Sequence, residues 1–86
     1  MDSFGLITVP EELNGKLEIN DIEGRHYELE TKDGIYVIVH EKDSKYLARL
    51  LAGSVGKEIR VKGYEQGGFN IYQRGKMFKV ISVNVK

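Results

Sequence analysis

The strongest constraint on the fold is a period-two alternation of apolar and polar side chains, which begins at Lys16. Apolar side chains return at every second position of residues 26–31, and such alternation predicts a strand with one buried face. Asp33-Gly34 then separates this strand from an apolar run over residues 35–39. Because glycine adopts the positive φ of a tight turn, Asp-Gly between two such runs predicts a hairpin. The sequence therefore predicts a β-rich domain.

A different period interrupts the strands at residues 43–53. Asp43 or Ser44 is suited to an N-cap, because its side-chain oxygen can accept a free backbone N–H. Gly53 stands where a helix commonly ends. Between them, apolar side chains recur at helical spacing, namely Tyr46, Leu47, Leu50 and Leu51. We expect one short amphipathic helix here.

Two further strands are expected after the helix. Ile59 and Val61 alternate with charged neighbours over residues 57–63, and the last strand runs from residue 77 towards residue 85. Its apolar alternation changes phase near residues 80–82. A β-bulge at that point would explain the change, and so would a strand that is buried on both faces.

The N-terminal segment is expected to differ from the rest. Pro10 precedes two glutamates, and proline at a first helical position followed by acids favours a short turn of helix. We therefore divide the single domain of residues 1–86 into a leader, residues 1–14, that contains this turn, and a barrel, residues 15–86. A chain of 86 residues is long enough for one core and no more.

The element order is strand, strand, strand, helix, strand, strand. Together with the segment LLAGSVGKEIRVKG at residues 50–63, this order resembles an OB-fold domain over roughly residues 15–85. The resemblance implies an all-β fold with one short helix, a five-stranded Greek-key barrel whose helix lies between strands 3 and 4. An SH3-like or other small barrel is the alternative, and it would not need the helix. In OB-fold domains ligands bind across strands 2 and 3 and the loops after strands 1 and 4, here near residues 21–25 and 64–76.

Charge separates the two halves of the chain. The sequence holds 13 Lys and Arg against 13 Asp and Glu, and this balance argues against a generic polyanion binder. Residues 1–56 contain 6 basic and 11 acidic side chains, a net charge of −5, whereas residues 57–86 contain 7 and 2, a net charge of +5. Such asymmetry can mark an interaction surface. It can also cancel when a compact fold interleaves the halves.

The predicted loop after strand 4 combines aromatic and cationic side chains with amides and glycines. Proteins bind single-stranded nucleic acids by stacking bases on aromatic rings while cations contact the phosphates. We therefore expect a non-catalytic module that contacts single-stranded DNA or RNA through strands 4 and 5 and their loop. The candidate residues are Arg60, Lys62, Tyr64, Phe69, Tyr72, Arg74, Lys76 and Lys79.

Two alternatives remain open. The outward positions of strand 2 are expected to form an exposed acidic face, which could contact a protein partner and mainly set specificity and on-rate; its residues are Glu23, His26, Glu28 and Glu30. A strand edge could serve the same purpose and leaves a homo-oligomer open. A small carbohydrate or metabolite bound by the loop aromatics is the other alternative.

No catalytic, metal or cofactor motif stands out. The histidines, His26 and His40, are expected to be exposed or to lie at strand ends, with no sign of convergence on a metal. Cysteine is absent, which removes thiolate chemistry and favours a cytoplasmic location. No apolar run is long enough to predict a membrane span. We therefore expect neither an enzyme nor a membrane protein, and no cofactor.

Overall fold

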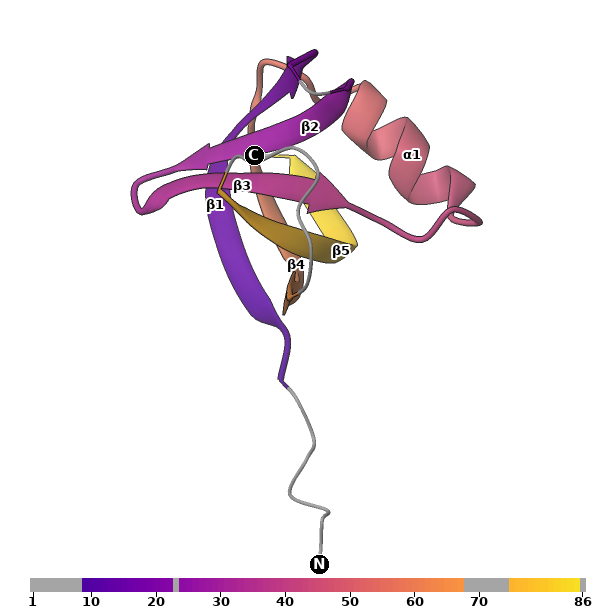
Figure 1. Ribbon diagram of the computed structural model, residues 1–86. Coiled ribbons are helices and arrows are strands. Elements are labelled where there is room, and N and C mark those ends of the chain that lie inside the picture. Colours follow the sequence, from indigo (N-terminus) through magenta and orange to yellow (C-terminus); the bar gives the residue numbers. More distant parts are fainter. Residues whose placement is uncertain (1–8, 23, 68–74, 86) are drawn as a thin grey trace, which may run out of the picture.

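The computed structural model describes residues 9–22, 24–67 and 75–85. These residues form five strands and one helix in the predicted order (Figure 1): β1 (Glu11–Asn20), β2 (His26–Thr31), β3 (Gly34–Val39), α1 (Lys45–Ala52), β4 (Glu58–Gln66) and β5 (Lys76–Val85). The strands close into a barrel in the order β1-β2-β3-β5-β4, with β3 and β5 parallel and the other pairs antiparallel. The predicted five-stranded barrel, with a helix between the third and fourth strands, is confirmed.

Strand β1 closes the barrel because it pairs with two partners in turn. Residues 11–16 pair with β4, and residues 16–20 pair with β2. Gly15 lies at the change of partner, and a Cβ there would collide with the backbone carbonyl of Glu30. The close approach of β1 to β2 therefore requires glycine at this position.

The prediction of a helical turn after Pro10 is wrong. Glu11 and Leu13 are already in β1, where they pair with Gly63 and Val61 of β4. The backbone groups of this segment gain partners in a strand ladder, which a single isolated helical turn would not supply. The barrel consequently begins at Glu11, four residues before the predicted boundary.

The predicted bulge is confirmed in β5. Lys62 pairs with Ser82 and Gly63 pairs with Val80, so Ile81 is the extra residue on β5. A Cβ at Gly63 would collide with the backbone carbonyl of Lys79. The bulge therefore relies on glycine in the opposite strand, and it leaves Ile81 49% exposed.

The core fills the barrel, and α1 packs against it. Leu17, Leu29, Ile59, Val61 and Phe78 are almost fully buried, and Leu47 and Leu51 of α1 belong to the same cluster. The Oγ of Ser44 accepts a hydrogen bond from the backbone N–H of Leu47 (3.4 Å), so Ser44 is the N-cap. In the described part of the chain, no helix has the length and apolar character needed to cross a membrane.

Candidate ligand-binding surfaces

The β4–β5 outer face consists of four of the predicted nucleic-acid residues. Arg60, Lys62 and Tyr64 occupy alternate positions of β4, while Ile59 and Val61, which directly precede Arg60 and Lys62, point into the core. The strand register places Lys79 of β5 directly opposite Tyr64. This face therefore places an aromatic ring next to cations, as the sequence predicted. Phe69, Tyr72 and Arg74 lie outside the described residues.

Carboxylates neutralise most of the cations near this face. The Nε atom of Arg60 lies 3.0 Å from the Oε2 atom of Glu12 on β1, and Lys79 donates a hydrogen bond to Glu41. Lys76, at the start of β5, is 3.7 Å from the carboxylate of Glu65.

Lys62 differs from these three, since no ion pair joins it to another residue within the described ranges. The hydrogen bond and the charge of Lys79 hold the pKa of the Glu41 carboxyl below its ordinary value. The fold thus interleaves the acidic and basic halves of the sequence.

The expected acidic face of strand 2 is largely buried. His26 is 7% exposed and Glu28 is 5% exposed, so the prediction that both are solvated is wrong. Glu30 is exposed, and Glu23 lies outside the described residues. Val37, the cross-strand partner of Glu28, is fully buried although it is not part of the core cluster. Burial therefore extends to the outer side of β2 and β3, which alternation alone cannot reveal.

His26 and Glu28 form a hydrogen-bonded pair within β2. The Nδ1 of His26 donates to the carbonyl of Gly24 (2.7 Å), because a carbonyl oxygen can only accept. The Nε2 of His26 lies 2.7 Å from the Oε2 of Glu28. That second bond requires one more proton, carried by either the imidazole or the carboxyl group. The pair thus satisfies two buried polar side chains at once.

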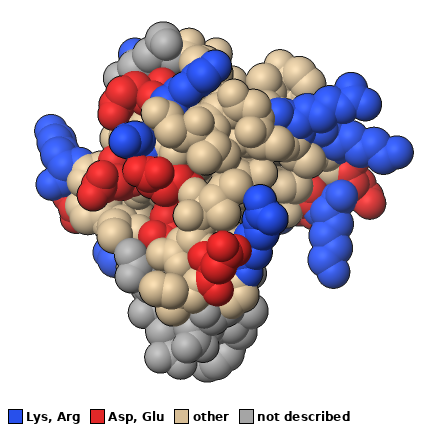
Figure 2. Space-filling model, turned by 90° about the horizontal axis from the view of Figure 1, so that it is seen from above, with Lys and Arg blue, Asp and Glu red and all other residues tan. Residues whose placement is uncertain are grey.

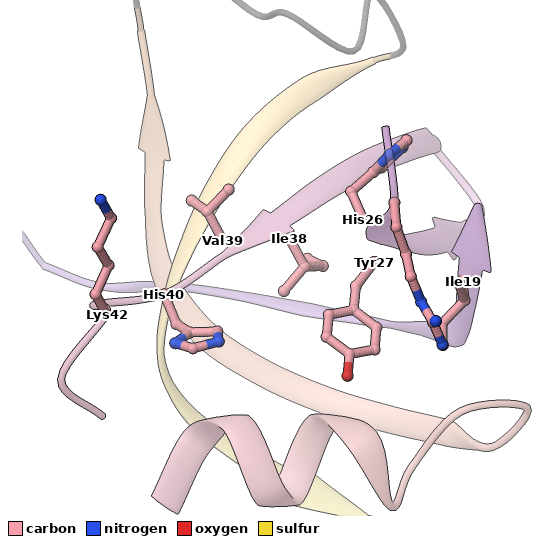
Figure 3. Close-up of a pocket in the computed structure, with 8 residues that line it drawn as sticks. Ile19, His26, Tyr27, Ile38, Val39, His40 and Lys42 are labelled. Atoms are coloured by element: carbon pink, nitrogen blue, oxygen red, sulfur yellow. The ribbon is translucent and has the colours of Figure 1, made fainter. Parts of the chain in front are cut away.

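A hollow of about 450 Å³, here called the Tyr27 hollow, opens where β1, β2 and β3 reach the α1 end of the barrel. Strand pairing joins Ile19 to Tyr27 and Tyr27 to Ile38, which places the three in one row. Figure 3 shows Tyr27, Ile38 and His40 directed to the side of the sheet on which the helix lies. The complete lining is Ile19, Arg25, His26, Tyr27, Ile38, Val39, His40 and Lys42.

The lining of the Tyr27 hollow carries cationic but no acidic side chains, because it includes Arg25 and Lys42 but no aspartate or glutamate. Neither Arg25 nor Lys42 forms an ion pair within the described residues. Figure 2 shows Lys and Arg side chains, with acidic side chains beside them, on the side of the molecule on which α1 lies in Figure 1. The sequence analysis missed this site, because the residues of its row lie in three strands and only the register brings them together.

A second hollow of about 460 Å³ adjoins the first and shares Val39, His40 and Lys42 with it. Its lining adds Met77 and Lys79 of β5, and it also includes Glu41 and Asp43. The two acidic side chains make this second hollow mixed in charge. Lys79 and the shared Lys42 therefore border carboxylates in this second hollow, whereas the lining of the Tyr27 hollow itself contains none.

The described residues contain no cluster of three or more histidine, aspartate or glutamate side chains suited to a metal ion. No protein-family model, curated protein or solved structure matches the chain.

Proposed function

We propose that the chain is a non-catalytic binding module of the OB type that contacts single-stranded nucleic acid through its β4–β5 outer face. The strand order of the closed barrel and the helix between β3 and β4 support the OB assignment. One arrangement of side chains supports the contact. Tyr64 is flanked by Lys62 on its own strand and by Lys79 on the neighbouring strand.

This arrangement suits a flexible polyanion. A base can stack on the ring of Tyr64, and stacking of this kind tolerates any base because every base has a π-face. Lys62 and Arg60 continue along β4 in the same direction, so they can follow the phosphates on one side of the stacked base. The contact would therefore favour single strands over duplexes and show little preference for sequence.

The existing ion pairs oppose this binding only weakly. The Arg60 and Glu12 side chains are 49% and 43% exposed. Exposed pairs of this kind contribute about 0–1 kcal/mol. Replacing the Glu12 carboxylate by a phosphate therefore costs little free energy. The counterions released from the nucleic acid add a favourable entropy to binding.

The test is fluorescence anisotropy with labelled single-stranded DNA and RNA at low and at near-physiological salt. We expect affinity to fall steeply as salt rises. Arg60→Glu combined with Lys62→Glu should abolish binding. A matched control, Lys45→Glu combined with Arg49→Glu, changes the net charge equally at exposed sites on α1, and it should retain most of the affinity.

Equal loss in both double variants would show that overall charge drives the binding, and this would contradict the assigned face. Absence of binding at low salt would overturn the nucleic-acid proposal. A protein partner would then be the leading alternative, and Glu30 would be the exposed acidic position from which to begin.

A further inference from the structure

The floor of the Tyr27 hollow is apolar and supported by the core. Ile38 is only 3% exposed and belongs to the core cluster, and Tyr27 packs against that cluster. Ile19 and Tyr27 remain half-buried, so part of each side chain is available to a ligand. An apolar floor held by paired strands is largely preformed, which lowers the entropy that a ligand must lose on binding.

The volume of the hollow, about 450 Å³, suits a small molecule. Small-molecule sites typically measure roughly 300–1,000 Å³ and are lined mainly by apolar and aromatic side chains with a few polar groups. The row from Ile19 through Tyr27 to Ile38 supplies the apolar side chains. A flat ring system can lie against such a row and cover it.

The polar groups at the edge of the hollow favour a negative ligand. Arg25 and Lys42 are exposed, and neither is engaged by a carboxylate of the described residues. The Nδ1 of His40 donates to the carbonyl of Glu41 (2.8 Å), which holds the ring in place. A ligand anion therefore meets cations without first displacing an acidic side chain.

We propose that the Tyr27 hollow binds small organic anions that carry a flat apolar body, at a site separate from the β4–β5 outer face. The ring of the ligand packs on Ile19 and Tyr27, and its anionic group reaches Arg25 or Lys42. Both an aromatic carboxylate and a nucleoside monophosphate have this chemistry. The inference does not depend on the proposed nucleic-acid contact, because the two sites use different cations.

The test is a titration of the ¹⁵N-labelled chain of residues 1–86 monitored by NMR, with two pairs of probes matched in shape. AMP is compared with adenosine, and 2-naphthoate is compared with 2-naphthalenemethanol. We expect the anions to shift the amide signals of Tyr27, Ile38 and His40, and the neutral partners to bind about threefold to tenfold more weakly. Saturation by AMP alone would identify a nucleotide-type ligand, and saturation by naphthoate alone would identify an aromatic acid.

Two variants separate this site from the other one. Arg25→Gln combined with Lys42→Gln should reduce anion affinity about threefold to tenfold, whereas Lys32→Gln combined with Lys45→Gln should not. Arg60→Glu combined with Lys62→Glu should leave anion binding intact while nucleic-acid binding is lost. Equal binding of charged and neutral probes, shifts confined to other regions, or no shift at about 1 mM ligand would each overturn the proposal.

Discussion

The β4–β5 outer face and the Tyr27 hollow both present cations, but they hold them differently. On the outer face, Arg60 is paired with Glu12 and Lys79 is bonded to Glu41. At the hollow, Arg25 and Lys42 have no such partner within the described residues. An anion must therefore displace a carboxylate to reach Arg60 or Lys79, whereas it can reach Arg25 or Lys42 without doing so.

This difference indicates what each region can recognise. An anion on the outer face competes with carboxylates, so useful affinity needs several phosphates acting together along the strand. In the hollow a single anionic group can meet a cation directly, while apolar contact supplies the rest of the affinity. The outer face thus suits a polymer, and the hollow suits a small molecule.

The largest effect is expected at the buried, hydrogen-bonded pair of His26 and Glu28. His26→Ala removes one partner of Glu28, and breaking a buried pair costs about 3 kcal/mol in the free energy of unfolding. Urea denaturation should show this loss. Glu30→Ala on the same strand is the control, because Glu30 is exposed and should change stability by less than about 0.5 kcal/mol. Equal stability of the two variants would contradict a structural role for the pair.

A smaller effect is expected when the outer face is made to resemble the hollow. Glu12→Gln frees Arg60 from its carboxylate partner, and it should raise the affinity for single-stranded oligonucleotides about twofold to fourfold at low salt. Glu11→Gln changes the net charge by the same amount at a neighbouring exposed position and should have a weaker effect. Anisotropy titrations would compare them. A decrease in affinity for Glu12→Gln would show that the ion pair positions Arg60 for binding.

Removal of the unpaired cations should hardly change stability. Arg25→Gln combined with Lys42→Gln breaks no described ion pair, so its free energy of unfolding should stay within about 0.5 kcal/mol of the wild type. Urea denaturation of the double variant gives this number. A larger loss would mean that these cations serve the fold, and the contrast between the two regions would disappear.

The smallest effect concerns the exposed pair between Glu41 and Lys79. The hydrogen bond and charge of Lys79 lower the pKa of Glu41 from its ordinary value of 4.5. Because the folded pKa is depressed, any stabilisation from this pair is present above about pH 4.5 and is lost as the pH falls through the folded pKa. A ¹³C NMR titration of the Glu41 carboxyl should show the low pKa, and Lys79→Met should raise it. An unchanged pKa in that variant would contradict the pair.

Local patterns predicted most of the elements correctly. The predicted hairpin joins β2 to β3. Its two turn residues are Lys32 and Asp33, because Gly34, with a φ of +125°, already pairs with Thr31 at the start of β3. Ser44 caps the helix, and the phase change in the last strand is the bulge at Ile81. Each of these features depends on residues close together in the chain, whose conformational preferences act without help from the rest of the fold. The segment after Pro10 was mispredicted because long-range pairing with β4 decided its structure.

The candidate sites were less accessible to sequence reasoning. Alternation placed His26 and Glu28 on the outer side of β2, but it could not show that this side is covered. The charge asymmetry between the halves was visible, yet not the pairing of Arg60 with Glu12, since these residues meet only across β1 and β4. The loop residues Phe69, Tyr72 and Arg74 lie outside the described residues, and their role stays a prediction.

Local sequence patterns are enough to predict the strands after residue 15, the helix and its cap, the hairpin between β2 and β3 and the region of the bulge, because periodicity and turn chemistry are local. The packing of the barrel sets which cations are neutralised, which side chains of β2 are buried and where the Tyr27 hollow forms. These properties depend on the register between strands that are distant in the chain. Ion pairs and burial depend on distances of a few ångströms between side chains, and the sequence does not contain these distances.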